Sequence, residues 1–147
     1  MILETHAPLD QVVLMLGTND CKTYNHASAE RIGKGIEKLI QQIRKADPAI
    51  DILLVSPIEL GEDVWKPGFD LEFDQHSVKV SKQLKQTYLK IAWKYGCDFL
   101  AASDVATPSK ADMEHMNEDG HKNLAKAIES FLVEKERNHT NNYVNVV

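Results

Sequence analysis

The chain has 147 residues, of which 43% are hydrophobic and 27% charged, with a formal net charge of −5. These values predict one ordinary globular domain and argue against nucleic acid and membrane surfaces as partners. No apolar run is long enough for a transmembrane helix, and the N-terminal residues lack the features of a signal peptide. Two cysteines do not make a disulfide framework, so we expect a cytoplasmic protein with reduced thiols.

The first half of the chain predicts a strand, a helix and a second strand. Residues 12–16 form a continuous apolar run, which favours a strand buried on both faces. Aliphatic residues then recur at helical spacing after Ser28, a residue that can cap a helix, and this helix ends at Asp47. Residues 52–55 form a second apolar run that Pro57 stops, so a second buried strand is expected there.

The second half repeats this alternation after a long loop over residues 58–74. Apolar side chains at helical spacing predict a helix that ends at Tyr95, and Gly96 stands where a left-handed C-terminal cap is favoured. Residues 97–101 predict a third strand, which leads into a loop over 102–116.

Asn117 can cap a final helix, and we expect one domain over 1–137 followed by a polar, frayed tail over 138–147. The order strand, helix, strand, helix, strand, helix predicts an α/β fold of three α/β/α layers around a parallel sheet. Ligand sites in such folds lie beyond the C-terminal ends of the strands.

Polar side chains follow the first and third predicted strands, so they should share one rim of the sheet. His115 can act as a general base near neutral pH, and Asp112 can hold its other ring nitrogen. Asn19 can donate a side-chain hydrogen bond to an oxyanion. Each motif also has a structural alternative. Asp112 and His115 could simply be two polar residues of a loop, and residues 17–20 around Asn19 could simply form a turn.

Other reactive side chains near this rim favour structural roles. Cys21 lacks the electropositive surroundings that activate a thiol, and His121 is expected to pack or cap. A metal site from Asp20, Asp112, His115 and His121 is conceivable, but no HExxH or CxxC spacing supports it. We therefore expect neither a metal nor an organic cofactor.

Two separated blocks resemble the SGNH (GDSL-type) hydrolase family: residues 17–20 (Gly-Thr-Asn-Asp) after a strand, and 112–115 (Asp-Met-Glu-His) before the last helix. The sequence is most similar to the arylesterase and perhydrolase-like branch, which shares a Pro-Leu-Asp lead-in, a Val-Ser-Pro and a Trp-containing excursion. The resemblance implies a flavodoxin-like fold, with Asn19 in the oxyanion hole, His115 as base and Asp112 as its orienting acid.

Two further blocks of that family have no counterpart in this sequence. These are the Gly-Asp-Ser-Leu block, which carries the nucleophilic serine, and the glycine block that completes the oxyanion hole. The resemblance thus implies that the N-terminal strand-helix-strand-helix unit of the fold is missing. The strand at 12–16 would pair with that unit, so we expect a partner chain, a second copy or the termini to cover its bare edge.

We therefore expect a serine ester hydrolase for small carboxylic esters, with little activity from this chain by itself. The expected partners are a small ester substrate and either further copies of the chain or a complementing N-terminal fragment. Two alternatives remain open: a non-catalytic oligomeric binding or assembly module on the same scaffold, and a metal-assisted phosphoesterase.

Overall fold

The computed structural model describes residues 5–144, and the side chains of residues 5–137. The observed order of elements is the predicted one. Three parallel strands form a sheet in the order β1-β2-β3: β1 (Gln11–Leu14), β2 (Asp51–Ser56) and β3 (Asp98–Ala101). The long helices are α2 (Ala29–Ala46), α3 (Gln75–Tyr95) and α4 (Glu118–Val144), and short 3₁₀ turns occupy Asn19–Cys21 (η1), Thr23–Asn25 (η2) and Ala102–Asp104 (η3).

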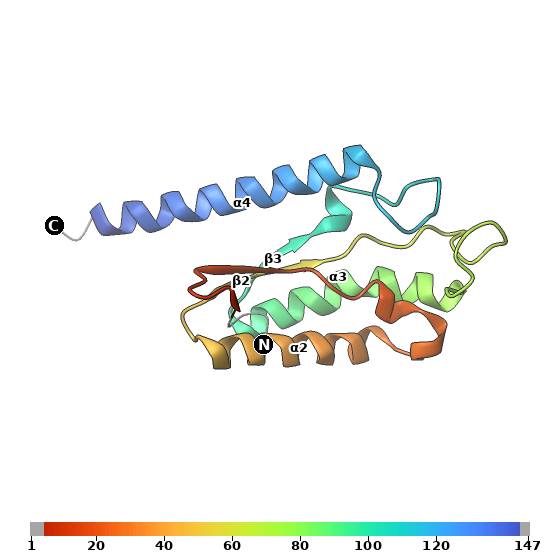
Figure 1. The fold of residues 1–147 in the computed structure, drawn as a ribbon, viewed down its shortest axis with the longest axis horizontal. Coiled ribbons are helices and arrows are strands. Elements are labelled where there is room, and N and C mark those ends of the chain that lie inside the picture. Colours follow the sequence, from red (N-terminus) through yellow and green to blue (C-terminus); the bar gives the residue numbers. More distant parts are fainter. Residues whose placement is uncertain (1–4, 145–147) are drawn as a thin grey trace.

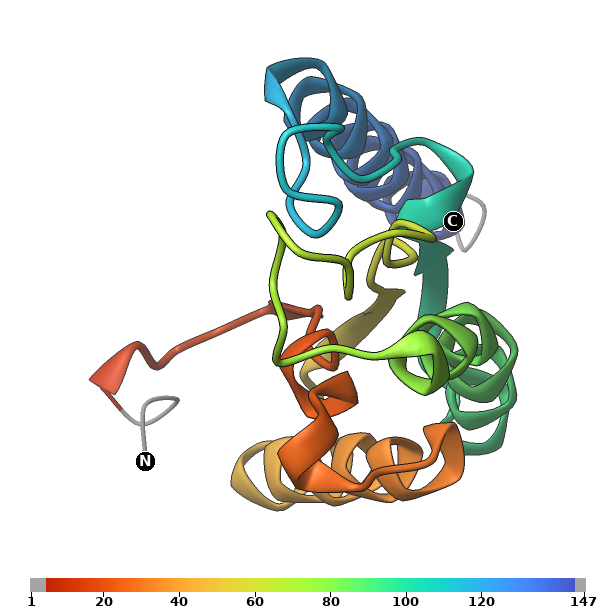
Figure 2. The same ribbon diagram turned by 90° about the vertical axis from the view of Figure 1, so that its right-hand side faces the viewer.

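The sheet lies between two helical layers, as the sequence predicts. Helices α2 and α3 lie side by side on one face, and α4 crosses the other face (Figure 1; Figure 2). The fold is therefore a three-layer α/β/α arrangement around a parallel sheet. No helix in the described part of the chain is long and apolar enough to span a membrane.

Local sequence accounts for where the helices begin and end. The Ser28 hydroxyl accepts a hydrogen bond from the Arg31 amide at 3.2 Å and starts α2. Asp74 and Ser77 form a reciprocal capping box that starts α3, five residues before its first predicted apolar position. Gly96 ends α3 in the left-handed conformation, with φ of 62°. The Asn117 side chain accepts the Gly120 amide at 2.8 Å and caps α4.

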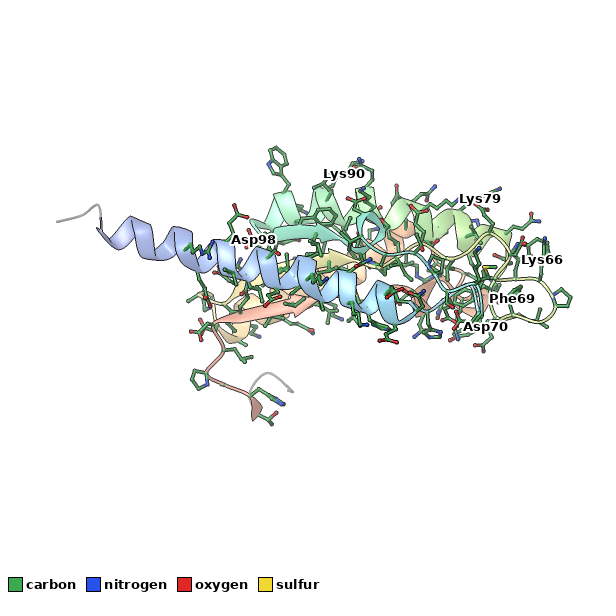
Figure 3. All side chains as sticks on the ribbon, turned by 90° about the horizontal axis from the view of Figure 1, so that it is seen from above. Lys66, Phe69, Asp70, Lys79, Lys90 and Asp98 are labelled. Atoms are coloured by element: carbon green, nitrogen blue, oxygen red, sulfur yellow. The ribbon has the colours of Figure 1, made fainter. Side chains whose placement is uncertain are left out.

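The two neighbouring strands β1 and β2 differ in burial, and this corrects one expectation. Both faces of β2 are covered, with Leu53 and Leu54 each 0% exposed. In β1, Leu14 is buried against the α2 and α3 layer, but Val13 on the opposite face is 42% exposed. The run at 12–16 is thus not buried on both faces, because α4 packs over β2 and β3 and leaves β1 beside it at the sheet edge (Figure 3).

The C-terminal region also departs from the expected frayed tail. Helix α4 continues to Val144, past the predicted boundary at residue 138. Residues 145–147 and the side chains of 138–144 lie outside the described part of the chain. The polar composition after 138 is therefore compatible with helix, since the backbone hydrogen bonds of a helix are made within the segment itself.

Candidate active site

The segment after β1 turns sharply and presents Asn19 at the rim of the sheet. Gly17 has φ of 131°, a conformation that favours glycine. The amides of Asp20 and Cys21 then donate to the carbonyls of Gly17 and Thr18 at 3.1 and 3.0 Å, which closes the η1 turn. Asn19 is exposed at the start of this turn, so its side chain can reach a ligand.

The loop after β3 is folded around the Asp112 carboxylate. One oxygen, Oδ1, accepts the backbone amides of Glu114 and His115, each at 3.0 Å. The other, Oδ2, lies 3.0 Å from Nδ1 of the His115 ring. Asp112 thus fixes both the loop and the imidazole, and the second ring nitrogen, Nε2, is the one that can exchange a proton with a ligand.

Asp112 is held in its ionised form by this loop. Partial burial opposes ionisation, but the hydrogen bonds from the Glu114 and His115 amides and from the His115 ring outweigh it and lower the pKa of Asp112. A carboxylate that stays charged can stabilise an imidazolium on its neighbour. The pair therefore has the electrostatics of a general base with its orienting acid.

A second contact fastens this loop to the excursion after β2. The Gly61 amide donates to the Met113 carbonyl at 2.7 Å, and Met113 itself has a positive φ of 60°. A Cβ on Gly61 would lie 2.8 Å from the Met113 side chain, so only glycine allows this approach. The long loop at 58–74 thus has a structural task, which is to support the loop that carries His115.

Asn19 and His115 line one pocket of about 280 Å³. This volume is near the lower end for small-molecule sites. The walls combine apolar and polar side chains: Met15, Thr18, Asn19, Pro57, Ile58, Glu114, His115, Met116 and His121. The fold therefore brings the two sequence-predicted blocks to a single cavity, although they lie far apart along the chain.

The pocket also includes residues that sequence reasoning did not assign to it. His121 was expected to pack or cap, but it lies exposed on the first turn of α4 and contributes to the pocket wall. Met15 and Met116 supply apolar wall. The last helix follows directly on the His115 loop, so its first turn lies at the same rim as Asn19. This placement was the signal that could have assigned His121 to the pocket.

No serine lines this pocket. Ser56 ends β2 but is 0% exposed, and its hydroxyl has no hydrogen-bond partner. Ser103 lies in η3 beside a different depression. Thr18 is the one hydroxyl residue of the pocket wall, so the arrangement offers a base, its acid and an amide donor, without a serine nucleophile among the residues around it.

Neither a thiol nor a metal is supported here by the described residues. Cys21 is buried, and burial together with nearby Asp20 raises its pKa to about 12, so the thiol is protonated at neutral pH. Within the part of the chain that the structure describes, no three His, Cys, Asp or Glu side chains are grouped to hold a metal ion.

Comparisons with known proteins identify the family of this chain. The profile of the GDSL-like lipase/acylhydrolase family matches residues 2–123. A structure described as a carbohydrate acetylesterase family member from Sinorhizobium meliloti is 31% identical, with a TM-score of 0.81 over 89% of this chain and 63% of that one. The aryl esterase of M. smegmatis is 28% identical, with a TM-score of 0.84 over 90% of this chain and 64% of that one.

A third structure, a putative arylesterase from Agrobacterium tumefaciens, is 27% identical, with a TM-score of 0.77 over 88% of this chain and 63% of that one. The chain thus spans less than two thirds of the length of these structures. No curated protein matches the sequence. By sequence profile and by fold, this chain belongs to the GDSL-like lipase/acylhydrolase family.

Proposed function

We propose that this chain carries the acid–base and oxyanion-binding part of a serine ester hydrolase. The observation that supports this function is the shared pocket, in which Asn19 stands with a histidine that an ionised aspartate orients. In the reaction, a serine would attack the ester carbonyl, and His115 Nε2 would accept its proton and return it to the leaving alcohol. Asp112 would hold the ring, and the Asn19 amide would donate to the oxyanion.

The serine comes from a segment outside these 147 residues that packs beside β1. Two observations support this source: the pocket wall contains no serine, and Met15, next to the uncovered edge, lines the same pocket. A strand added at this edge would end at the pocket rim, because parallel strands end on the same side of a sheet. The nucleophile would then stand next to His115.

The substrate we propose is an ester with a small acyl group. The pocket of about 280 Å³ has an apolar wall built from Met15, Ile58 and Met116, which suits an acetyl group better than a long chain. One similar structure is described as a carbohydrate acetylesterase family member, which agrees with an acetyl group, and another as an aryl esterase.

Hydrolysis of p-nitrophenyl acetate tests this proposal. The chain is assayed alone and with the part of the M. smegmatis aryl esterase that its match does not cover, supplied as a separate chain and as an N-terminal fusion. We expect little turnover alone and clear turnover in the fusion. His115→Ala should then lower kcat by at least about a thousandfold, since the histidine carries both proton transfers.

His76→Ala is the matched control, because it removes an exposed imidazole from α3 that does not line this pocket. It should retain most of the activity. Asn19→Ala should cost roughly a hundredfold to a thousandfold in kcat. Turnover that survives His115→Ala, or a folded fusion with no turnover, would contradict the serine mechanism.

A second function, a non-catalytic assembly module, is favoured by one observation: three large apolar side chains stay exposed at or just beyond β1, namely Val13, Met15 and Leu16. Such an edge is suited to pairing with another chain. This function predicts a stable oligomer and no gain of activity when the missing segment is supplied. The same fusion experiment therefore separates the two.

A further inference from the structure

A buried tyrosine of α3 is hydrogen-bonded to the segment that leads from β1 into the Asn19 turn. Tyr88 of α3 is 0% exposed, and its hydroxyl donates to the Leu16 carbonyl at 2.7 Å. Burial, with Asp20 and Cys21 nearby, raises the pKa of Tyr88, so the phenol remains a protonated donor. This bond links α3 directly to the backbone just ahead of the turn.

Gly17 shows how closely the phenol approaches that backbone. A Cβ at Gly17 would lie 2.3 Å from the Tyr88 hydroxyl oxygen, well inside van der Waals contact. Gly17 also has φ of 131°, so both its conformation and its neighbour require glycine. The Tyr88 ring therefore occupies the space directly against the backbone at which the turn begins.

The turn that carries Asn19 follows directly on the Leu16–Gly17 peptide, and hydrogen bonds hold it in place. The Gly17 carbonyl accepts the Asp20 amide at 3.1 Å, and Asn25 Nδ2 donates to the Asn19 carbonyl at 3.0 Å. The backbone of Asn19 is thus anchored on both sides, and the residue lines the pocket shared with His115. The orientation of the amide depends on this backbone, since an Asn side chain has only two rotatable bonds.

We propose that Tyr88 is a positioning residue that, through Leu16 and Gly17, aims the Asn19 amide into the pocket. It does not touch the substrate. This inference rests on the proposed role of Asn19 as an oxyanion donor. It assigns to α3, on the far side of the sheet from α4, a share in the geometry of the site.

The test compares Tyr88→Phe with Tyr95→Phe. Both tyrosines belong to α3, and both hydroxyls are hydrogen-bonded: the Tyr88 hydroxyl donates to the Leu16 carbonyl, and the Tyr95 hydroxyl accepts from Gln41 Nε2 at 3.0 Å. The two substitutions thus remove the same group from the same helix, but only the first lies next to the Asn19 turn. Phenylalanine keeps the ring and its packing, so both variants should fold.

The readout is amide hydrogen exchange, followed by NMR at the η1 turn and in β2. Amides in a short surface turn exchange by local opening, whereas core strand amides report global unfolding. Tyr88→Phe should accelerate exchange at Asp20, Cys21 and Lys22 by roughly tenfold, the loss expected for one hydrogen bond. Tyr95→Phe should leave these three amides unchanged. Acceleration of β2 amides without the turn amides would mean a merely structural role and would overturn the proposal.

The catalytic part is tested in the fusion described above. Tyr88→Phe should lower kcat by about tenfold and leave KM unchanged, because the oxyanion forms only in the transition state. In the Asn19→Ala background it should have no further effect on kcat. An unchanged kcat in Tyr88→Phe overturns the positioning role. If Asn19→Ala itself leaves kcat unchanged, the proposed function of Asn19 fails, and the exchange result still shows whether Tyr88 holds the turn.

Discussion

The two faces of the sheet are built differently, and the contrast appears within a single pair of strands. On the α2 and α3 face, Leu14 and Leu54 are partners in the β1–β2 register and both are buried. On the α4 face, Val13 and Leu53 are also partners, but Leu53 is 0% and Val13 is 42% exposed. Two helices thus cover the strands on one side, whereas the one helix on the other side leaves β1 uncovered.

The candidate pocket lies on this less covered face. Its walls include His121 of α4 and Met116 and Ile58, which belong to or pack against the smaller apolar cluster under α4. The larger cluster, on the α2 and α3 side, includes Tyr88 and holds the turn that carries Asn19. The more fully covered layer thus holds the backbone ahead of the Asn19 turn, while the α4 face leaves Val13 of β1 exposed at the sheet edge.

The largest expected effect is on stability. It is measured by truncating three side chains of the β1–β2 pair to alanine. Leu54→Ala should lower the free energy of unfolding by about 4 kcal/mol and Leu53→Ala by about 3 kcal/mol, since both leave cavities. Val13→Ala should cost less than about 1 kcal/mol, because its side chain is already partly in water. Urea unfolding measures all three. A Val13→Ala loss as large as that of Leu53→Ala would show that the edge is covered in solution.

The next effect concerns association through the uncovered edge. When no further segment covers this edge, we expect a second copy of the chain to pair there, with self-association measurable by analytical ultracentrifugation. Val13→Lys should raise the Kd of that association by at least about tenfold, because it places a charge in the apolar contact. Trp93→Lys is the control, since Trp93 is 89% exposed but lies on α3, away from the edge. A protein that stays monomeric at every concentration would contradict pairing between copies.

The smallest expected effect is a difference in how the caps of α3 and α4 contribute to the pH dependence of stability. Hydrogen bonds from Ser77 outweigh partial burial and lower the pKa of Asp74, which caps α3, whereas α4 is capped by neutral Asn117. A lowered pKa means that the stabilisation by Asp74 is present above the ordinary carboxyl pKa and is lost as pH falls through the lowered value. Asp74→Ala and Asn117→Ala should each cost about 1 kcal/mol at neutral pH.

Only Asp74→Ala should reduce the acid dependence of stability, which urea unfolding between neutral and acidic pH measures. Asp112 also has a lowered pKa and contributes acid dependence in both variants. The comparison is therefore made as the difference of each variant from the unmodified chain. An equal change of slope in Asn117→Ala would contradict the assignment to the α3 cap.

Much of the architecture was predictable because its signals are local. The Ser28 cap, the left-handed Gly96 and the apolar stripe of α2 are confirmed close to their predicted positions. The start of α3 at Gln75 agrees with the predicted end of the long loop at 74, but the capping box of Asp74 and Ser77 that fixes it was not predicted, since this first turn carries little apolar pattern. The three-residue spacing of Asp112 and His115 was only a weak signal, and the observed contact depends on the fold of the whole loop.

The amino-acid sequence by itself determined the order of strands and helices, their caps and the two polar blocks at strand ends, because these depend on neighbours within a few residues. The tertiary structure alone decided that α4 leaves Val13 exposed, that His121 joins the pocket and that Tyr88 reaches the Leu16 carbonyl. These contacts join residues distant in the chain, and only the packing of helices on the sheet sets such distances.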